Sequence, residues 1–445
     1  MTSLPRALSP LRHRQYRLLA ASMAFSLLAA GVWAVALVWQ VVALRGGPAA
    51  LSLVTALAAG GMLATTLLGG ALADRIPQRR ILLATELVQG TTMAVVAALS
   101  LTGVVQLWQL AAVGLVGGLA MGLYYPAYSA LVPALVPEGE LLAVNGLEGM
   151  VRPMLQNAAG PAAAGFLVAA LSPGAALAAT AAASLLAAAC LWGLPTTPVR
   201  RDPPADGEEA TGLLADVREG FVYMVRTPWL FATLLFASLM LLVFIGPLEV
   251  LVPFAIKDAG GGPTQHGYVL AAFGVGGAVG SLVVASLRLP RRYLTVMNLF
   301  WGLGCVPLVV FGFGADLWLM IAAGAVMGAT FQAGMVIWGT LLQRRVPPAL
   351  LGRVSSLDFF VSLSFMPLSM ALAGTVSEVV GLPAVFLIAG LAPMVMAAVA
   401  IVWARMPADE VANPLDRAPA DADRDGMDDG AGTAPVLEGE PWPSR

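Results

Sequence analysis

A lone carboxylate lies in a strongly apolar stretch near the middle of the chain. Glu249 is the only charged residue of Phe244–Ile256, FIGPLEVLVPFAI. Burying an unpaired carboxylate in apolar surroundings is costly, so we expect this side chain to face a cavity or to be protonated. Either state suits a proton carrier. The alternative is structural: Glu249 lies near a helix end, in contact with water.

Two further charges have the spacing of one helix face. Glu148 and Arg152 are four residues apart, so on a helix their side chains can form an ion pair. Such a pair is either a structural staple or a gate that breaks during a conformational cycle, with Glu148 as a second candidate for proton coupling. Two other acids, Glu86 and Asp358, are expected near helix ends, where they are solvated or cap a helix.

Aromatic, methionine and amide side chains could line a cavity for a large amphipathic ligand. Methionine and aromatic walls adapt to such ligands. The structural alternative for each residue is packing or contact with lipid. The candidates are Trp33, Gln40, Tyr124, Tyr128, Met240, Phe244, Gln332, Met335 and Trp338.

The inventory of reactive groups argues against an enzyme. No nucleophile–base constellation is visible, and Cys190, Cys305, His13 and His266 are too scattered in sequence for a zinc cluster. The glycine-rich stretch at 274–280, GVGGAVG, follows no strand and contains no lysine, so we interpret it as close helix packing. We expect no catalytic residue, metal or other cofactor, and no nucleic-acid partner.

The elements that must position these residues are membrane helices. The 445-residue chain is 59% hydrophobic and 11% charged, with a mean hydropathy of +0.83, which indicates a polytopic membrane protein. A bilayer core requires about 20 apolar residues per helix. The pattern predicts an all-α fold of twelve spans near 18–44, 49–73, 81–103, 106–132, 144–171, 173–195, 229–256, 266–287, 293–313, 317–343, 353–379 and 383–404.

The distribution of basic residues orients these spans. Arginines gather before span one and in the alternate loops except 133–143, which has two glutamates and no basic residue, whereas the opposite side carries Arg45 and Lys257. The positive-inside rule therefore predicts a multi-pass inner (plasma) membrane protein with both termini in the cytoplasm. We divide the chain into a cytoplasmic segment (1–17), a six-helix bundle (18–195), a linker with an amphipathic helix (196–228), a second six-helix bundle (229–404) and a disordered acidic tail (405–445).

The two bundles repeat each other at an offset near 210 residues. Gly114 and Gly118 in span four match Gly324 and Gly328 in span ten, and Glu148 matches Asp358. A persistent offset of this kind indicates duplicated halves, as in the parallel repeats of secondary transporters.

A charged turn and three further stretches resemble a known transporter family. Residues 69–80, GGALADRIPQRR, resemble the cytoplasmic loop signature of the major facilitator superfamily. The stretches at 124–137, 158–165 and 346–357 resemble its third drug–proton antiporter family, which includes macrolide-efflux and enterobactin-exporter-like proteins. The residues that carry these motifs are Gly70, Asp74, Arg75, Arg79 and Arg80 in the turn, and Gly160, Pro161 and Gly165 in span five.

The resemblance implies a role for each motif. Asp74 would clasp the start of helix eleven, near Arg353–Ser355, and close the cytoplasmic side. The Gly160-Pro161 pair would kink span five and form a seal that favours export. The alternatives are a loop charge that only sets topology and ordinary helix packing.

These observations together predict a monomeric carrier that works by alternating access. We expect export of an amphipathic small molecule, such as a drug, an antibiotic or a siderophore, in exchange for protons across the lipid bilayer. Two alternatives stay open: an importer or uniporter of the same fold, and a membrane scaffold or sensor that transports nothing.

Overall fold

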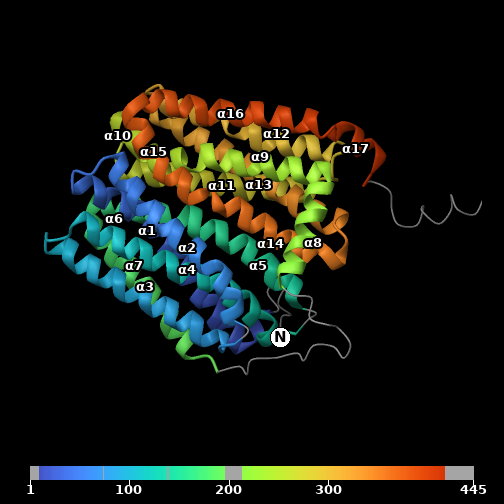
Figure 1. Ribbon diagram of the computed structural model, residues 1–445. Helices are drawn as coiled ribbons and strands as arrows, with labels where there is room; N and C mark the ends of the chain where they lie inside the picture. The colour runs from blue at the N-terminus through green and yellow to red at the C-terminus, as the bar shows by residue number, and fades with distance from the viewer. Residues whose placement is uncertain (1–9, 74, 138–139, 196–212, 416–445) are drawn as a thin grey trace, which may run out of the picture.

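The computed structural model describes residues 10–73, 75–137, 140–195 and 213–415, and within these ranges it contains helices and no strands. Figure 1 shows two groups of long helices, one from each half of the chain. The first half comprises α1 (Arg14–Ala43), α2 (Pro48–Ala73), α3 (Gln78–Leu101), α4 (Leu107–Leu135), α5 (Leu141–Arg152), η3 (Pro153–Ala159), α6 (Gly160–Ala170) and α7 (Pro173–Trp192).

The second half follows the helix α8 (Leu213–Arg226), which falls in the stretch where a short amphipathic helix was expected. It comprises α9 (Pro228–Gly246), η4 (Pro247–Leu251), α10 (Val252–Asp258), α11 (Pro263–Ser286), α12 (Tyr293–Gly304), η5 (Val306–Gly312), α13 (Leu317–Arg345), α14 (Pro348–Ser364), α15 (Met366–Val380), α16 (Leu382–Trp403) and α17 (Met406–Ala412).

Eleven helices among the described residues are long and apolar enough to cross a membrane, judged by length and composition. The sequence predicted twelve spans, and the difference lies in the segment expected at 144–171. That segment consists of α5, η3 and α6 in succession, and it is not among the eleven. The π-helix η3 interrupts the α-helix of this segment and ends beside Gly160 and Pro161, the pair at which the sequence analysis predicted a kink.

Prolines account for the interruption. In η3 the Gly160 amide donates to the Leu155 carbonyl five residues back, which is the hydrogen bond of a π-helix. Pro161, the next residue, has no amide to donate. The same arrangement occurs in η4, where the Val252 amide donates to the Pro247 carbonyl immediately before Pro253. Within the described residues, each half therefore contains one proline-flanked π-helical segment.

Glycines allow close contacts between neighbouring helices in both halves. A methyl group at Gly114 of α4 would lie 3.1 Å from the Val54 carbonyl oxygen of α2. The repeat-related Gly324 of α13 faces α11 in the same way, because a methyl group there would lie 2.8 Å from the Val269 carbonyl oxygen. The glycine pattern of the sequence therefore corresponds to one packing solution used twice.

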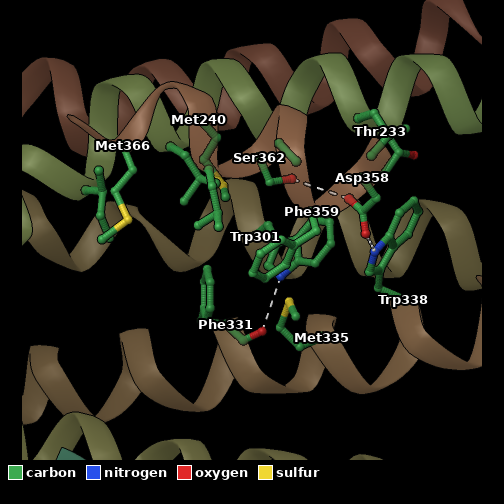
Figure 2. A pocket seen from close by; sticks show the side chains of 15 residues that line it. Thr233, Met240, Trp301, Phe331, Met335, Trp338, Asp358, Phe359, Ser362 and Met366 are labelled. Carbon is green, nitrogen blue, oxygen red and sulfur yellow. Dashed lines mark hydrogen bonds between the residues drawn. The ribbon is translucent and has the colours of Figure 1, made fainter. Parts of the chain in front are cut away.

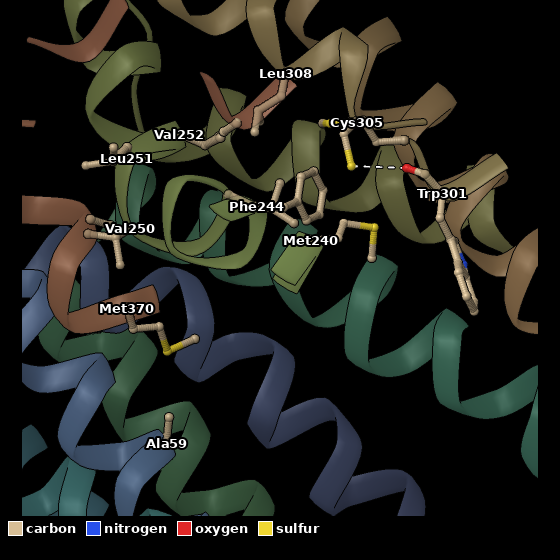
Figure 3. Packing of buried hydrophobic residues seen from close by; sticks show 14 of the residues in the cluster. Ala59, Met240, Phe244, Val250, Leu251, Val252, Trp301, Cys305, Leu308 and Met370 are labelled. Atoms are coloured by element: carbon tan, nitrogen blue, oxygen red, sulfur yellow. Dashed lines mark hydrogen bonds between the residues drawn. The ribbon is translucent and has the colours of Figure 1, made fainter. Parts of the chain in front are cut away.

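The two halves meet at the end of the molecule where α1 ends and α2 begins. The Gly374 amide of α15 donates to the Ser52 hydroxyl of α2 over 2.7 Å. Near this contact, Ala59 of α2 and Met370 of α15 belong to one buried hydrophobic cluster (Figure 3). The cluster also includes η4 residues such as Val250, so it joins the halves near the π-helix.

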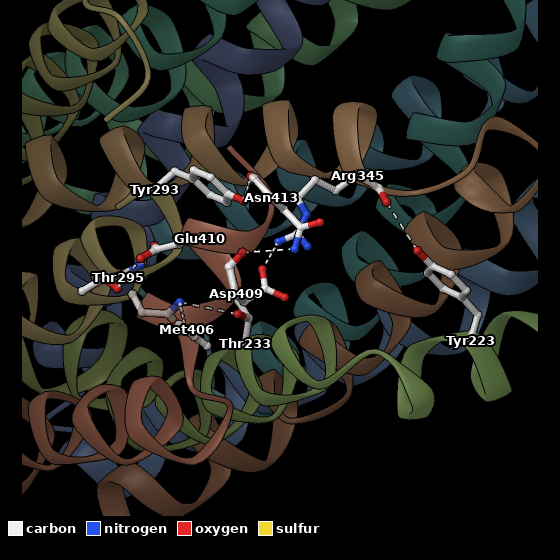
Figure 4. Close-up of polar contacts among 10 residues, drawn as sticks. Tyr223, Thr233, Tyr293, Thr295, Arg345, Met406, Asp409, Glu410 and Asn413 are labelled. Carbon is white, nitrogen blue, oxygen red and sulfur yellow. Dashed lines mark hydrogen bonds and ion pairs between the residues drawn. The ribbon is translucent and has the colours of Figure 1, made fainter. Parts of the chain in front are cut away.

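The tail differs from expectation at its start, because residues 406–412 form the helix α17 rather than disordered chain. Asp409 forms an ion pair with Arg345, whose guanidinium lies 4.7 Å from the centre of the Trp229 ring. Glu410 accepts a hydrogen bond from the Thr295 amide in the first turn of α12 over 2.7 Å (Figure 4). An acid at that position satisfies a free helix amide, so α17 is held to the bundle. The acidic stretch at 416–445 lies outside the described residues.

Candidate functional site

A cavity of about 280 Å³ lies between the two halves, and Glu249 lines it. The first half contributes residues of α1, η3 and α6, and the second half contributes residues of α9, η4, α10, α11 and α13. Among the described residues, the Glu249 carboxylate has no hydrogen bond or ion pair with another side chain. Glu249 therefore faces a cavity, and its role in proton coupling stays a prediction.

The two π-helical segments meet this cavity from opposite halves. Gln156 and Asn157 of η3 line it together with Glu249 of η4. π-helical segments are rare and frequently occur at functional sites, because the wider turn changes where side chains point. The arrangement places one carboxylate and two amides in a mostly apolar space. The carboxylate can exchange a proton, and the amides can donate and accept hydrogen bonds.

A second cavity, also of about 280 Å³, lies within the second half (Figure 2). Its charged residue is Asp358 of α14, which accepts hydrogen bonds from Trp338 Nε1 over 2.9 Å and from the Ser362 hydroxyl over 3.3 Å. The Trp301 indole donates to the Phe331 carbonyl over 3.2 Å. Thr233 and apolar side chains supply the remaining walls; the apolar residues are Leu234, Ala237, Met240, Leu241, Ile245, Met335, Phe359, Leu363 and Met366.

The first half contains the repeat-related counterpart of that hydrogen bond. The Tyr128 hydroxyl of α4 donates to Glu148 Oε1 of α5 over 2.6 Å. The predicted ion pair between Glu148 and Arg152 is absent between these two described side chains. Arg152 instead lies over the Tyr125 ring, 5.7 Å from its centre. The helical spacing predicted that Glu148 and Arg152 pair with each other. In the structure each contacts a tyrosine of α4 instead: Tyr128 for Glu148 and Tyr125 for Arg152.

The predicted cavity residues divide between cavities and packing contacts. Met240, Met335 and Trp338 line the cavity that contains Asp358, and Phe244 lines the cavity between the halves. Tyr124 lines a small cavity of about 20 Å³ and stacks on Tyr128, with ring centres 6.0 Å apart. The others make packing contacts: Gln40 is buried and accepts a hydrogen bond from Ser100, Trp33 packs against the core, and Gln332 lies against Gly277.

The motif of the charged turn is described in part. Asp74 lies outside the described residues, and Gly70 lies in α2. Arg75 and Arg80 are exposed. Arg79 donates to the carbonyl oxygens of Leu191 and Trp192 over 3.0 and 2.7 Å, so it caps the last turn of α7.

The motif of span five lies at contacts of α6 with α1 and α11. A methyl group at Gly160 would lie 2.7 Å from the Gly31 Cα of α1. A methyl group at Gly165 would lie 2.6 Å from the Pro263 carbonyl oxygen, at the start of α11 in the other half. Gly160 and Gly165 therefore permit close approach on both sides of this helix.

Two acids have positions that the sequence reasoning missed. Glu86 is 3% exposed and lines a cavity of about 20 Å³ beside Tyr124, so it is not a solvated residue at a helix end. Asp358 lines the cavity of the second half instead of capping a helix. The signal for Asp358 was present, because the 210-residue offset that relates it to Glu148 also relates Trp338 to Tyr128.

Relatives of the chain are transporters. The MFS-type transporter y4rN of Sinorhizobium fredii is 33% identical over 277 residues, which are 61% of this chain and 65% of that protein, slightly under two thirds of its length. Multidrug efflux pump Tap of Mycolicibacterium fortuitum is 28% identical over 84% of this chain and 92% of that protein. Macrolide efflux protein A of Streptococcus pyogenes is 23% identical over 83% of this chain and 91% of that protein.

The fold is that of solved transporters. The crystal structure of the nucleoside transporter NupG matches with a TM-score of 0.69 and 15% identity, over 88% of this chain and 98% of that one. The model of the family described as "Transmembrane secretion effector" matches residues 5–433. These findings confirm the resemblance predicted from the sequence motifs. The chain belongs to the transmembrane secretion effector family of major facilitator superfamily (MFS) transporters.

Proposed function

We propose that this transporter exports an amphipathic small molecule in exchange for protons. The observation that carries the proposal is Glu249, a carboxylate without a protein partner among the described residues, which lines the cavity between the halves. A carboxyl group there binds and releases a proton as the cavity opens to one side of the membrane and then to the other. Protonation would thereby be linked to the conformational cycle.

The proposed topology has twelve crossings, with α5, η3 and α6 together forming the fifth and both termini in the cytoplasm. The basic residues favour this orientation. In that orientation the contact between Ser52 and Gly374 lies at the outer end. The conformation described above would then open toward the cytoplasm, which is the loading state of an exporter.

Export is favoured over import by the named activities of the relatives, two of which are efflux proteins. It is also consistent with the glycines of span five. Close packing of Gly165 against the start of α11 would seal the outer end in this conformation. The latch role of Asp74, through the loop that precedes α3, belongs to the same proposal and would close the cytoplasmic side in the other state.

The test is active efflux of ethidium from energised cells and from inside-out vesicles that contain the full chain. Glu249→Gln keeps the shape of the side chain but removes the exchangeable proton, so we expect ethidium binding to persist and uphill transport to be lost. Asp258→Asn is the matched control, because Asp258 is an exposed acid at the end of α10 in the same segment. Proton-driven pumping by Glu249→Gln at the wild-type rate would remove this carboxylate from the mechanism.

A further inference from the structure

The cavity around Asp358 combines three features that recognise one class of ligand. Aromatic rings of Trp301, Trp338, Phe331 and Phe359 line it, and Met240, Met335 and Met366 add polarisable sulfur (Figure 2). Aromatic faces attract cations, and methionine walls adapt to irregular apolar shapes. The one formal charge among the residues that line this cavity is the Asp358 carboxylate.

The partners of Asp358 leave its charge uncompensated. Both hydrogen-bond donors, the Trp338 indole and the Ser362 hydroxyl, are neutral. No basic side chain among the described residues forms an ion pair with it. The guanidinium of Arg345 lies over the Trp229 ring, and Trp229 meets Trp338 edge to face. Arg345 forms its ion pair with Asp409 and not with Asp358.

The repeat-related carboxylate in the first half is a control provided by the molecule itself. Glu148 accepts the equivalent hydrogen bond from Tyr128, a side chain that is 2% exposed. The residue at the position of Ser362 is Arg152, whose positive charge lies one helical turn from Glu148. Glu148 therefore has a positive charge within one helical turn, whereas the residues one turn from Asp358, Val354 and Ser362, are uncharged.

We propose that the cavity of α9, α12, α13 and α14 binds a lipophilic organic cation, with Asp358 as the counter-ion and the Trp301 and Trp338 rings as its walls. A protonated amine or a quaternary onium group on an aromatic body fits this description. The volume, about 280 Å³, is near the lower limit for small-molecule pockets. An anion would be repelled by Asp358, and a neutral ligand would gain nothing from its charge.

This inference deepens the proposed function, since it names the chemical class of the exported molecule, but it is tested by binding rather than by transport. The full chain is placed in nanodiscs of uncharged lipid and dialysed to equilibrium against radiolabelled methyltriphenylphosphonium. Triphenylphosphine oxide is the matched neutral probe, because it has the same three rings and no net charge. Empty nanodiscs give the contribution of the bilayer.

We expect the wild type to bind the phosphonium at least about tenfold more tightly than the oxide, which corresponds to one charge-dependent contact. Asp358→Asn should weaken phosphonium binding about tenfold and leave oxide binding unchanged. Asp358→Glu should restore it, and Glu148→Gln should have no effect. Ser362→Arg, which places a cation one turn from Asp358, should also abolish the preference for the phosphonium, whereas Ser362→Gln should preserve it.

Several results would overturn the proposal. Equal affinity of the wild type for both probes would show that charge plays no part. Phosphonium binding by Asp358→Asn or Ser362→Arg at the wild-type affinity would place the cation elsewhere. If Asp358→Asn fails to elute as a folded protein, the two variants of Ser362 decide the question. If Glu249→Gln loses efflux but binds the phosphonium normally, both the cation site and the export proposal stand. If the wild type binds the phosphonium but exports nothing, the export proposal fails and the cation site stands.

Discussion

The two halves contain the same polar link in different surroundings. Tyr128 donates to Glu148 in the first half, and Trp338 donates to Asp358 in the second half, with the partners 20 residues apart in each case. The first link is packed, and an arginine lies one turn away. The second opens onto a cavity of aromatic and methionine side chains. Duplication of one structural device can therefore leave one copy structural and free the other for ligand binding.

The largest effect on stability is expected from breaking the packed link. Tyr128→Phe removes the hydroxyl and leaves the partly buried Glu148 carboxylate without its hydrogen bond, at a cost of about 1–3 kcal/mol. The thermal unfolding midpoint of the detergent-purified protein should fall accordingly. Tyr125→Phe, which changes an exposed tyrosine on the same helix, is the control. An unchanged midpoint for Tyr128→Phe would show that the link contributes little.

Removing one donor to Asp358 in the second half should cost less. Ser362→Ala removes the hydroxyl, but Trp338 still donates to Asp358 and the adjoining cavity can admit water, so we expect a loss of about 0.5–1.5 kcal/mol. The same unfolding measurement gives the comparison directly. A greater loss for Ser362→Ala than for Tyr128→Phe would reverse the assignment of structural and ligand-binding copies.

The smallest effect is expected at the arginine of the first half. Arg152→Ser reproduces the residue found at the matching position of the second half and removes a contact with the Tyr125 ring that is worth about 0.5–1 kcal/mol at an exposed site. Because no cavity among the described residues surrounds Glu148 with aromatic and methionine side chains, the variant should gain no phosphonium binding at Glu148. Dialysis of Arg152→Ser combined with Asp358→Asn checks this point, since restored binding would mean that charge alone creates the site.

Much of the fold could be predicted because hydropathy alone determines where long apolar helices lie. The expected span at 266–287 is α11, Pro263–Ser286, and the expected span at 317–343 is α13, Leu317–Arg345. The π-helical segments could not be placed, because they depend on the local competition between hydrogen-bond registers around Pro161 and Pro253.

The candidate site was predicted less completely for a related reason. Glu249 stood out because no charge lies near it in sequence, and the structure places it at the cavity between the halves. Asp358 was misjudged because hydropathy put the start of its helix at residue 353, whereas α14 begins at Pro348 and carries the acid about three turns into the bundle. Partners from other helices, such as Tyr128 for Glu148, are set by packing and not by spacing.

The central claim, that Glu249 couples export to proton flow, is tested most directly by measuring protons rather than substrate. Proteoliposomes with a trapped pH indicator and no initial pH gradient receive an ethidium gradient. In the wild type, outward ethidium flow should draw protons inward and shift the internal pH. In Glu249→Gln the ethidium flow should continue without that shift. An equal shift of internal pH in the variant would contradict the account.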